Sequence, residues 1–149
     1  MKENILVSSC LLGELVKYDG SHNKLEDILL KKLQDKYNII PVCPEVEGGL
    51  GTPRTPCEIV LHNPLKIINK DGEDKTIEFI NGANHTIKLA IMKNVKIALL
   101  KSNSPSCSNK YIYDGNFSDN KVIGVGITTM ILEENEIKVY NEKEIMQIL

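Results

Sequence analysis

The stretch Ile5-Leu6-Val7-Ser8-Ser9-Cys10 is a short apolar run that ends in a cysteine, and it is typical of a buried β-strand. The same arrangement occurs twice more: Cys43 follows Ile39-Ile40-Pro41-Val42, and Cys107 ends the loop after Ile97-Ala98-Leu99-Leu100. Such runs, separated by helical stretches, predict a parallel sheet covered on both faces. Because ligands bind at the edge where parallel strands end, the three cysteines are expected to meet there. Three thiolates at one edge suggest a metal or cluster site with one coordination position left open.

Helical periodicity separates these strands. Leu25, Ile28, Leu29 and Leu33 recur at helical spacing. Residues 74–93 predict a longer amphipathic helix, with an apolar stripe formed by Ile77, Ile80, Ala83, Ile87, Ala90 and Ile91. The other predicted elements are extended pieces at 59–61 and 65–68, a helix at 123–134, a strand at 137–140 and a terminal helix at 142–149. The predicted fold is α/β, a single domain over residues 1–149 with three layers around a mostly parallel, Rossmann-like sheet.

Composition limits the classes of function. The chain has 149 residues, a formal charge of −2 and a pI of about 5.9, which give no electrostatic case for binding nucleic acid or an anionic membrane. The lack of tryptophan and the presence of only two phenylalanines argue against an aromatic platform for nucleic acid. No apolar stretch has transmembrane length, and the start does not resemble a signal peptide. Four cysteines without a secretory context favour metal or redox chemistry. We therefore expect a cytoplasmic protein that acts on a small molecule.

A segment rich in proline and glycine includes the second of these cysteines. Residues 41–56 contain four of the six prolines and three of the ten glycines, among them Gly48 and Gly49. Glycines let the backbone approach a ligand closely, and prolines fix the path of the chain. The segment also holds Arg54, the only arginine beside seventeen lysines. A lone arginine suits a fork of hydrogen bonds that lysine cannot reproduce, and a structural role in the loop is equally open.

A short repeat links two of the cysteine loops. Tyr18-Asp19-Gly20 follows Cys10, and Tyr113-Asp114-Gly115 follows Cys107. Asp-Gly is a common turn pair, so turn chemistry alone accounts for the repeat. The functional interpretation is that both loops fold back over the same crevice and shape its walls.

Three segments, in order along the chain, carry a resemblance to a bacterial family. They are Val7-Ser8-Ser9-Cys10-Leu11-Leu12-Gly13, Cys43-Pro44-Glu45-Val46 with Gly48-Gly49-Leu50-Gly51-Thr52-Pro53-Arg54, and Lys101-Ser102-Asn103-Ser104-Pro105-Ser106-Cys107. Together they resemble the thiouracil desulfurase family, and the likeness continues through Tyr113-Asp114-Gly115-Asn116-Phe117 over nearly the whole chain. The sequence departs from the family at Ser108, where glycine is frequent, and at Cys57, where a small residue is usual. Residues 123–128 are also looser than the family's Gly-Asp-Gly-Val-Thr.

This resemblance implies that Cys10, Cys43 and Cys107 hold a [4Fe-4S] cluster whose fourth iron has no protein ligand. It also implies non-redox hydrolysis of the C–S bond in a thiolated pyrimidine or thionucleoside, with Glu45 and Ser104 paired in proton transfer. Glu45 lies two residues from Cys43, close enough for its carboxylate to reach the substrate or the attacking water. The residues expected to contact the substrate are Arg54, Gly48, Gly49, Ser9 and Ser106, and the two serines can also donate hydrogen bonds to cluster sulfurs.

Two other functions stay open from the residues. One is a non-enzymatic iron–sulfur cluster carrier, although electron carriers normally use four cysteine ligands. The other is a zinc-binding module, although the chain has no closely spaced cysteine pair. Spacing alone would allow Cys57 as a fourth ligand, whereas the resemblance places it outside the group. The three histidines, His22, His62 and His85, have no metal-ligand spacing.

Overall fold

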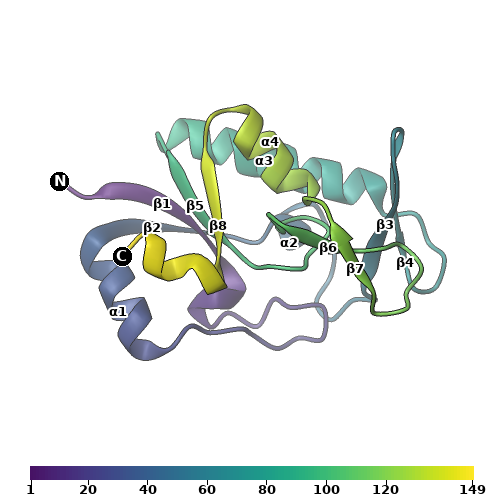
Figure 1. Cartoon of the computed structure of the whole chain (residues 1–149), viewed down its shortest axis with the longest axis horizontal. Helices are drawn as coiled ribbons and strands as arrows, with labels where there is room; N and C mark the ends of the chain where they lie inside the picture. The colour runs from purple at the N-terminus through teal and green to yellow at the C-terminus, as the bar shows by residue number, and fades with distance from the viewer.

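The chain folds around a sheet of four strands that are all parallel. The computed structural model describes residues 1–149, and the strand order across the sheet is β2-β1-β5-β8. The strands are β1 (Glu3–Ser8), β2 (Tyr37–Val42), β5 (Ile97–Leu100) and β8 (Lys138–Asn141). β1 lies in the interior and pairs in parallel with β2 and β5, and β5 pairs in parallel with β8. The predicted α/β fold with a parallel sheet is confirmed (Figure 1).

Helices cover both faces of the sheet, which accounts for the continuous apolar runs at residues 5–7 and 97–100 of the two inner strands. They are α1 (Asp27–Lys36), α3 (Thr76–Met92), α4 (Ile127–Glu134) and the 3₁₀ helix η2 (Glu142–Gln147). In β1, Ile5 and Val7 belong to the core under α1 and η2, whereas Leu6 belongs to the core under α3 and α4. The two pairs of helices lie on opposite sides of the sheet in Figure 1. The result is a three-layer arrangement.

None of the helices is both long enough and apolar enough to span a lipid bilayer.

Two hairpins lie beyond the ends of the parallel strands (Figure 1). They are β3 (Cys57–His62) with β4 (Leu65–Asn69), and β6 (Tyr111–Tyr113) with β7 (Lys121–Ile123), each antiparallel. Ile59, Ile67 and Ile112 from these hairpins share a third core with Phe79 of α3 and Ile127 of α4. The hairpins are thereby fixed to the helical layer and close off the edge of the sheet where the strands end.

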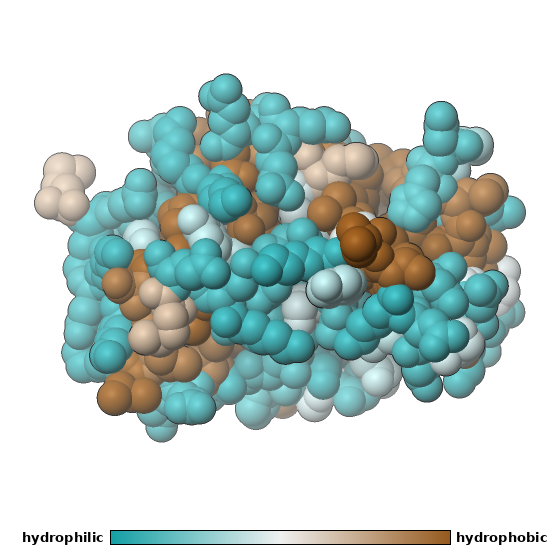
Figure 2. Space-filling view, in the orientation of Figure 1, coloured by the Kyte–Doolittle hydropathy of each residue, from teal (hydrophilic) through white to brown (hydrophobic).

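The surface shown in Figure 2 is mainly hydrophilic, with a compact hydrophobic patch over the region of β7. Val122 and Ile123, the last two residues of β7, are both exposed. This composition agrees with the slightly negative mean hydropathy of −0.16.

The predicted apolar stripe of the long helix is wrong in part. The buried residues of α3 are Phe79, Gly82, Ala83, Thr86 and Ala90. Ile77, Ile80 and Ile91, which we expected in the stripe, are exposed. The reason is a close approach to α2 (Pro44–Glu47): a Cβ atom on Gly82 would lie 1.9 Å from the carbonyl oxygen of Pro44. Apart from Phe79, the buried face consists of small residues, so counting large apolar side chains selected the wrong face.

Two boundaries also differ from expectation. The helix predicted at 123–134 begins only at Ile127, because residues 121–123 form β7 and Gly126 is extended. The predicted terminal helix is present as the 3₁₀ helix η2 and ends at Gln147 rather than at residue 149. The predicted helix at 25–33 starts at Asp27, and the strands at 97–100 and 138–141 match their predicted positions within one residue.

Candidate active site

Cys10, Cys43 and Cys107 line one cavity of about 480 Å³ at the edge where the strands end. Cys10 lies in the 3₁₀ helix η1 (Ser9–Leu12) directly after β1. Cys43 follows β2 and caps the N-terminus of α2, and Cys107 ends the loop after β5. Because β2, β1 and β5 are neighbours in the sheet, parallel pairing brings together residues up to 97 positions apart. The volume is typical of pockets for small molecules.

The three thiols are free and largely buried. Burial raises the pKa of Cys10, and the hydrogen bond from Asn23 Nδ2 to Cys10 Sγ, at 3.7 Å, opposes this shift. Burial also raises the pKa of Cys43 and, most strongly, that of Cys107. For Cys107, the charges of Glu45, Cys43 and Cys10 add to the effect of burial. A bound metal or cluster supplies the positive charge that favours the thiolate form of buried cysteines.

Three thiols that line one cavity are soft donors of the kind that iron–sulfur clusters use, so the residues present fit such a group. No group of three or more histidine, cysteine, aspartate or glutamate side chains is arranged to hold one metal ion. Thiolates on one tetrahedral zinc lie only about 3.8 Å apart, given Zn–S bonds of about 2.3 Å. In an iron–sulfur cluster each cysteine binds a different iron, so the sulfurs lie farther apart. The structure therefore gives no support to the zinc-module interpretation.

The loop that carries Cys107 is held by the N-terminus of α4. Thr129 Oγ1 donates to the carbonyl oxygen of Cys107 at 2.7 Å, and the hydroxyls of Ser106 and Thr128 are 2.7 Å apart. A Cβ atom on Gly126 would lie 2.4 Å from the backbone of Ser106, so the helix and the loop touch directly. Ser106 is fully buried in this contact and does not line the cavity. Its predicted contact with the substrate is therefore corrected to a structural one, whereas Ser9 does line the cavity.

Gly48 and Gly49 also lie outside the cavity, contrary to their prediction as substrate contacts. A Cβ atom on Gly48 would meet the carbonyl oxygen of Glu78 in α3 at 1.9 Å. Gly49 has a positive φ of 103° just after α2. Both glycines serve the packing and termination of the short helix that carries Glu45.

Glu45, Ser104 and Arg54 meet on one wall of the cavity. Ser104 Oγ accepts the N–H groups of Ser106 at 3.0 Å and Cys107 at 3.1 Å, and it donates to Glu45 Oε2 at 3.3 Å. Since its lone pairs face two N–H groups, the hydroxyl hydrogen is directed to the carboxylate. The predicted pairing of Glu45 with Ser104 is thus present as a contact.

Arg54 lies on the other side of this carboxylate. Its Nε is 3.5 Å from Glu45 Oε1, and its Nη1 donates to the carbonyl of Gly51 and to Thr52 Oγ1, both at 3.2 Å. The side chains of Arg54 and Glu45 are only 9% and 19% exposed. Burial raises the pKa of Glu45, and the positive charge of Arg54 opposes this shift. Nε has no hydrogen-bond partner and meets Glu45 only as an ion pair, whereas Nη1 makes the two hydrogen bonds. The guanidinium thus contacts the carboxylate and the loop at the same time, which a lysine amine is less suited to do.

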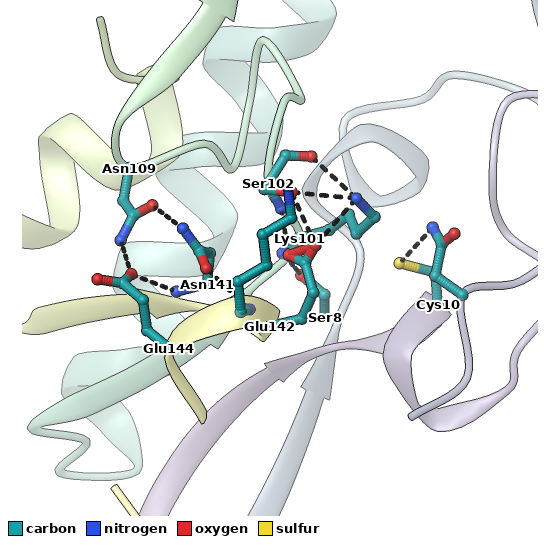
Figure 3. Close-up of polar contacts among 10 residues, drawn as sticks. Ser8, Cys10, Lys101, Ser102, Asn109, Asn141, Glu142 and Glu144 are labelled. Atoms are coloured by element: carbon teal, nitrogen blue, oxygen red, sulfur yellow. Dashed lines mark hydrogen bonds and ion pairs between the residues drawn. The ribbon is translucent and has the colours of Figure 1, made fainter. Parts of the chain in front are cut away.

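A second polar network was missed by the sequence analysis. Lys101 Nζ lies 3.2 Å from Glu142 Oε2, and Glu142 accepts the N–H and the hydroxyl of Ser102 at 2.8 and 2.7 Å (Figure 3). Lys101 and Ser102 line the cavity. Although burial raises the pKa of Glu142, hydrogen bonds from Ser102 and the charge of Lys101 bring it below its usual range. Lys101 and Ser102 belong to the segment 101–107 that carries the family resemblance. Glu142 lies outside the three segments of that resemblance, so no motif in the sequence indicated it.

Cys57 lines the same cavity as the three predicted ligand cysteines. Its thiol donates to the carbonyl of Thr55 at 3.7 Å, and burial, aided by the charge of Glu45, raises its pKa to about 12. The charges that act on it are those of Glu45, Arg54, Lys75 and Glu78. It remains a protonated thiol with a backbone partner.

Known proteins share this sequence and fold. Residues 5–144 match the family model described as 2-thiouracil desulfurase. The chain is 41% identical over 152 residues to the uncharacterized protein YbbK of Bacillus subtilis (strain 168), across 97% of this chain and 99% of that protein. Among solved structures it is similar to the [4Fe-4S]-dependent thiouracil desulfidase TudS, with a TM-score of 0.92 and 37% identity, across 99% of this chain and 95% of that one.

Proposed function

Because this chain belongs to the 2-thiouracil desulfurase family, we propose that it hydrolyses the C–S bond of a thiolated pyrimidine such as 2-thiouracil. One water molecule is consumed, the thiocarbonyl becomes a carbonyl, and sulfur leaves as hydrogen sulfide, so no net electron transfer is needed. The observation that supports this most is that three cysteines and the Glu45–Ser104 pair line the same cavity. We propose that residues 1–149 act as one desulfurase-like domain.

The cofactor we propose is a [4Fe-4S] cluster held by Cys10, Cys43 and Cys107. When bound by three cysteines, such a cluster supplies an iron without a protein ligand, a Lewis acid suited to a soft thiocarbonyl sulfur. Asn23 donates a hydrogen bond to the sulfur of Cys10, and Lys101 is the cation that acts on the same sulfur. Both contacts favour the thiolate form of this ligand.

Proton transfer is assigned to Glu45 and Ser104. The carboxylate of Glu45 takes a proton from the attacking water, directly or through the hydroxyl of Ser104, and returns it to the departing sulfur. The hydroxyl of Ser104 is oriented for this by the N–H groups of Ser106 and Cys107. Arg54 holds the opposite carboxylate oxygen, which keeps Oε2 turned to Ser104.

The experiment is turnover by the anaerobically cluster-loaded protein without added oxidant or reductant. We expect uracil and sulfide to form from 2-thiouracil in equal amounts, and in ¹⁸O-water the uracil takes up one labelled oxygen. Cys57→Ala serves as the matched control and should retain activity. Cluster-loaded protein that releases no sulfide would overturn the proposal and favour a cluster carrier. Sulfide release only with an added reductant would overturn the hydrolytic, non-redox mechanism.

A further inference from the structure

Aromatic side chains gather at the proposed site, although the chain has few of them. It has five tyrosines and two phenylalanines, and Tyr18, Tyr113 and Phe117 all line the cavity with the cysteines. Tyr18 and Tyr113 are the first residues of the two Tyr-Asp-Gly repeats. The two loops therefore do shape the walls of one crevice, and the catalytic scheme above uses none of these three residues.

The loop that carries Phe117 is fixed in place by a buried carboxylate. Glu58, only 8% exposed, accepts the N–H groups of Gly115 at 3.0 Å and Phe117 at 3.2 Å through the same oxygen, Oε1. A Cβ atom on Gly115 would lie 2.7 Å from the carbonyl oxygen of Ile59, so the loop presses against β3. Phe117 has a φ of +55°, a conformation that bulky residues rarely adopt. Such strain is kept where the surroundings enforce it, typically at ligand sites.

The position of Tyr18 is set by a different contact, which comes from the segment around Arg54. The N–H of Arg54 donates to the carbonyl oxygen of Tyr18 at 2.6 Å, which ties this loop to the segment of the proposed proton-transfer site. Tyr18 is 46% exposed although it lines the cavity, so it stands at the opening. Tyr113 is the last residue of β6, and the Nζ of Lys121 in β7 lies 5.7 Å from the centroid of its ring. Backbone contacts thus hold the segments of Tyr18 and Phe117, and pairing between β6 and β7 holds Tyr113. All three residues line one small cavity.

We infer that Tyr18, Tyr113 and Phe117 form the subsite that binds the planar ring of the substrate by stacking. This deepens the proposed function and rests on it for the identity of the ring. Stacking on aromatic side chains requires a flat π face and depends little on ring substituents. The subsite therefore selects flat heteroaromatic thiocarbonyl compounds over puckered or acyclic ones. A net charge of −2 and a cavity of about 480 Å³ favour a free small molecule over a nucleic acid.

The test compares two ligands that share hydrogen-bonding edges but differ in shape: planar uracil and puckered 5,6-dihydrouracil. Their dissociation constants are measured by calorimetry on the cluster-loaded protein. Phe117→Leu should weaken uracil binding about tenfold, equivalent to about 1.4 kcal/mol, and leave dihydrouracil binding nearly unchanged. Phe117→Tyr should restore uracil binding. Tyr111→Leu is the matched control, because Tyr111 is exposed and lies outside the cavity.

The inference is overturned if wild-type protein does not bind uracil, or if Phe117→Leu affects neither ligand or both equally. It is also overturned if a thiolated oligonucleotide binds more tightly than the free base. Binding is read without turnover, so the two proposals fail separately. Shape-selective binding without sulfide release would remove the desulfurase function alone, whereas sulfide release with an unchanged KM for 2-thiouracil in Phe117→Leu would remove the stacking subsite alone.

Discussion

The position of Glu45 is set by the adjacent residues Cys43 and Pro44 and by two contacts to its carboxylate. Pro44 begins the short helix α2 directly after Cys43, so the carboxylate is fixed close to a proposed cluster ligand without being one. Ser104 and Arg54 then contact different oxygens of this carboxylate. The two contacts orient the carboxylate for proton transfer, and single substitutions can test each of them separately.

Glu45→Gln tests the proton-transfer role. The amide has nearly the same shape and keeps hydrogen bonding to Ser104, but it cannot take up a proton. We expect sulfide release to fall roughly 10²- to 10⁴-fold, the usual contribution of a general acid–base group. Iron content after reconstitution should match wild type. Near-normal turnover in this variant would show that the proton moves by another route.

Arg54→Lys keeps the charge and removes the fork. A lysine amine cannot contact Glu45 and also donate to Gly51 and Thr52 as the guanidinium does. We expect kcat/KM for 2-thiouracil to fall on the order of tenfold, in line with the loss of hydrogen bonds to a charged group. Unchanged kinetics together with an unchanged melting temperature would leave Arg54 as an ordinary loop residue.

For single residues, the sequence predicts which residue types gather at the site better than it predicts which of them face the cavity. Cys10, Cys43 and Cys107 could be predicted as neighbours, because strand ends in a parallel sheet share one edge. Ser106 and Gly48 were assigned to the substrate and instead pack against α4 and α3. A small residue in a motif permits close approach of either a ligand or a neighbouring backbone, and composition does not tell the two apart.

Among the secondary-structure elements, the contact between α2 and α3 positions two proposed site residues, Cys43 and Glu45. Gly82→Ala would put a methyl group 1.9 Å from the carbonyl oxygen of Pro44, which lies between Cys43 and Glu45. Alanine favours a helix by up to about 1 kcal/mol over glycine, but overpacking against backbone costs about 1–3 kcal/mol or more, so the clash wins. We expect a lower melting temperature and reduced iron content by colorimetric assay.

Gly51→Ala is the control for this change, since its Cβ would lie 3.9 Å from the nearest atom, an ordinary contact. If Gly82→Ala retained wild-type stability and iron content, α3 would not be the element that positions α2.

The contact of η2 with the loop after β5 predicts a pH effect. The pKa of Glu142 in the folded protein is below its ordinary value of 4.5, because hydrogen bonds from Ser102 and the charge of Lys101 outweigh burial. Its stabilisation is therefore complete above about pH 4.5 and is lost as the pH falls through the folded pKa. Glu142→Gln should lower the free energy of unfolding by about 1–3 kcal/mol at pH 7 and flatten its decline in acid.

Urea unfolding of the cluster-free protein at several pH values measures this effect. Glu133→Gln is the control, because Glu133 is exposed on α4. Equal acid sensitivity of wild type and Glu142→Gln would mean that the network in Figure 3 adds nothing to stability.

Strands that are buried on both faces could be predicted from the sequence. Helices that bury only one face were harder to predict. The two inner strands, β1 and β5, are buried on both faces and contain unbroken apolar runs at residues 5–7 and 97–100. The inward face of α3 consists largely of small residues, since Gly82 touches backbone, and hydrophobic periodicity selected the larger isoleucines instead. The β6–β7 hairpin was missed because its strands have only three residues each.

In the whole molecule, parallel strand order brings three distant cysteines to one cavity, where we propose that they hold the cluster. β2, β1 and β5 end side by side, and the two hairpins close the cavity over their ends. A fourth cysteine, Cys57, lines the same cavity but donates its own hydrogen bond to Thr55. The proposed ligands are therefore three of the four cysteines that share this cavity.

The most direct measurement is iron per chain after anaerobic reconstitution of four single variants, Cys10→Ala, Cys43→Ala, Cys107→Ala and Cys57→Ala. Wild type and Cys57→Ala should bind close to four irons, the complement of one [4Fe-4S] cluster. Each of the other three variants should retain little iron, because a cluster with two cysteine ligands is poorly held. A full complement in any of these three, or loss of iron from Cys57→Ala, would contradict the assignment.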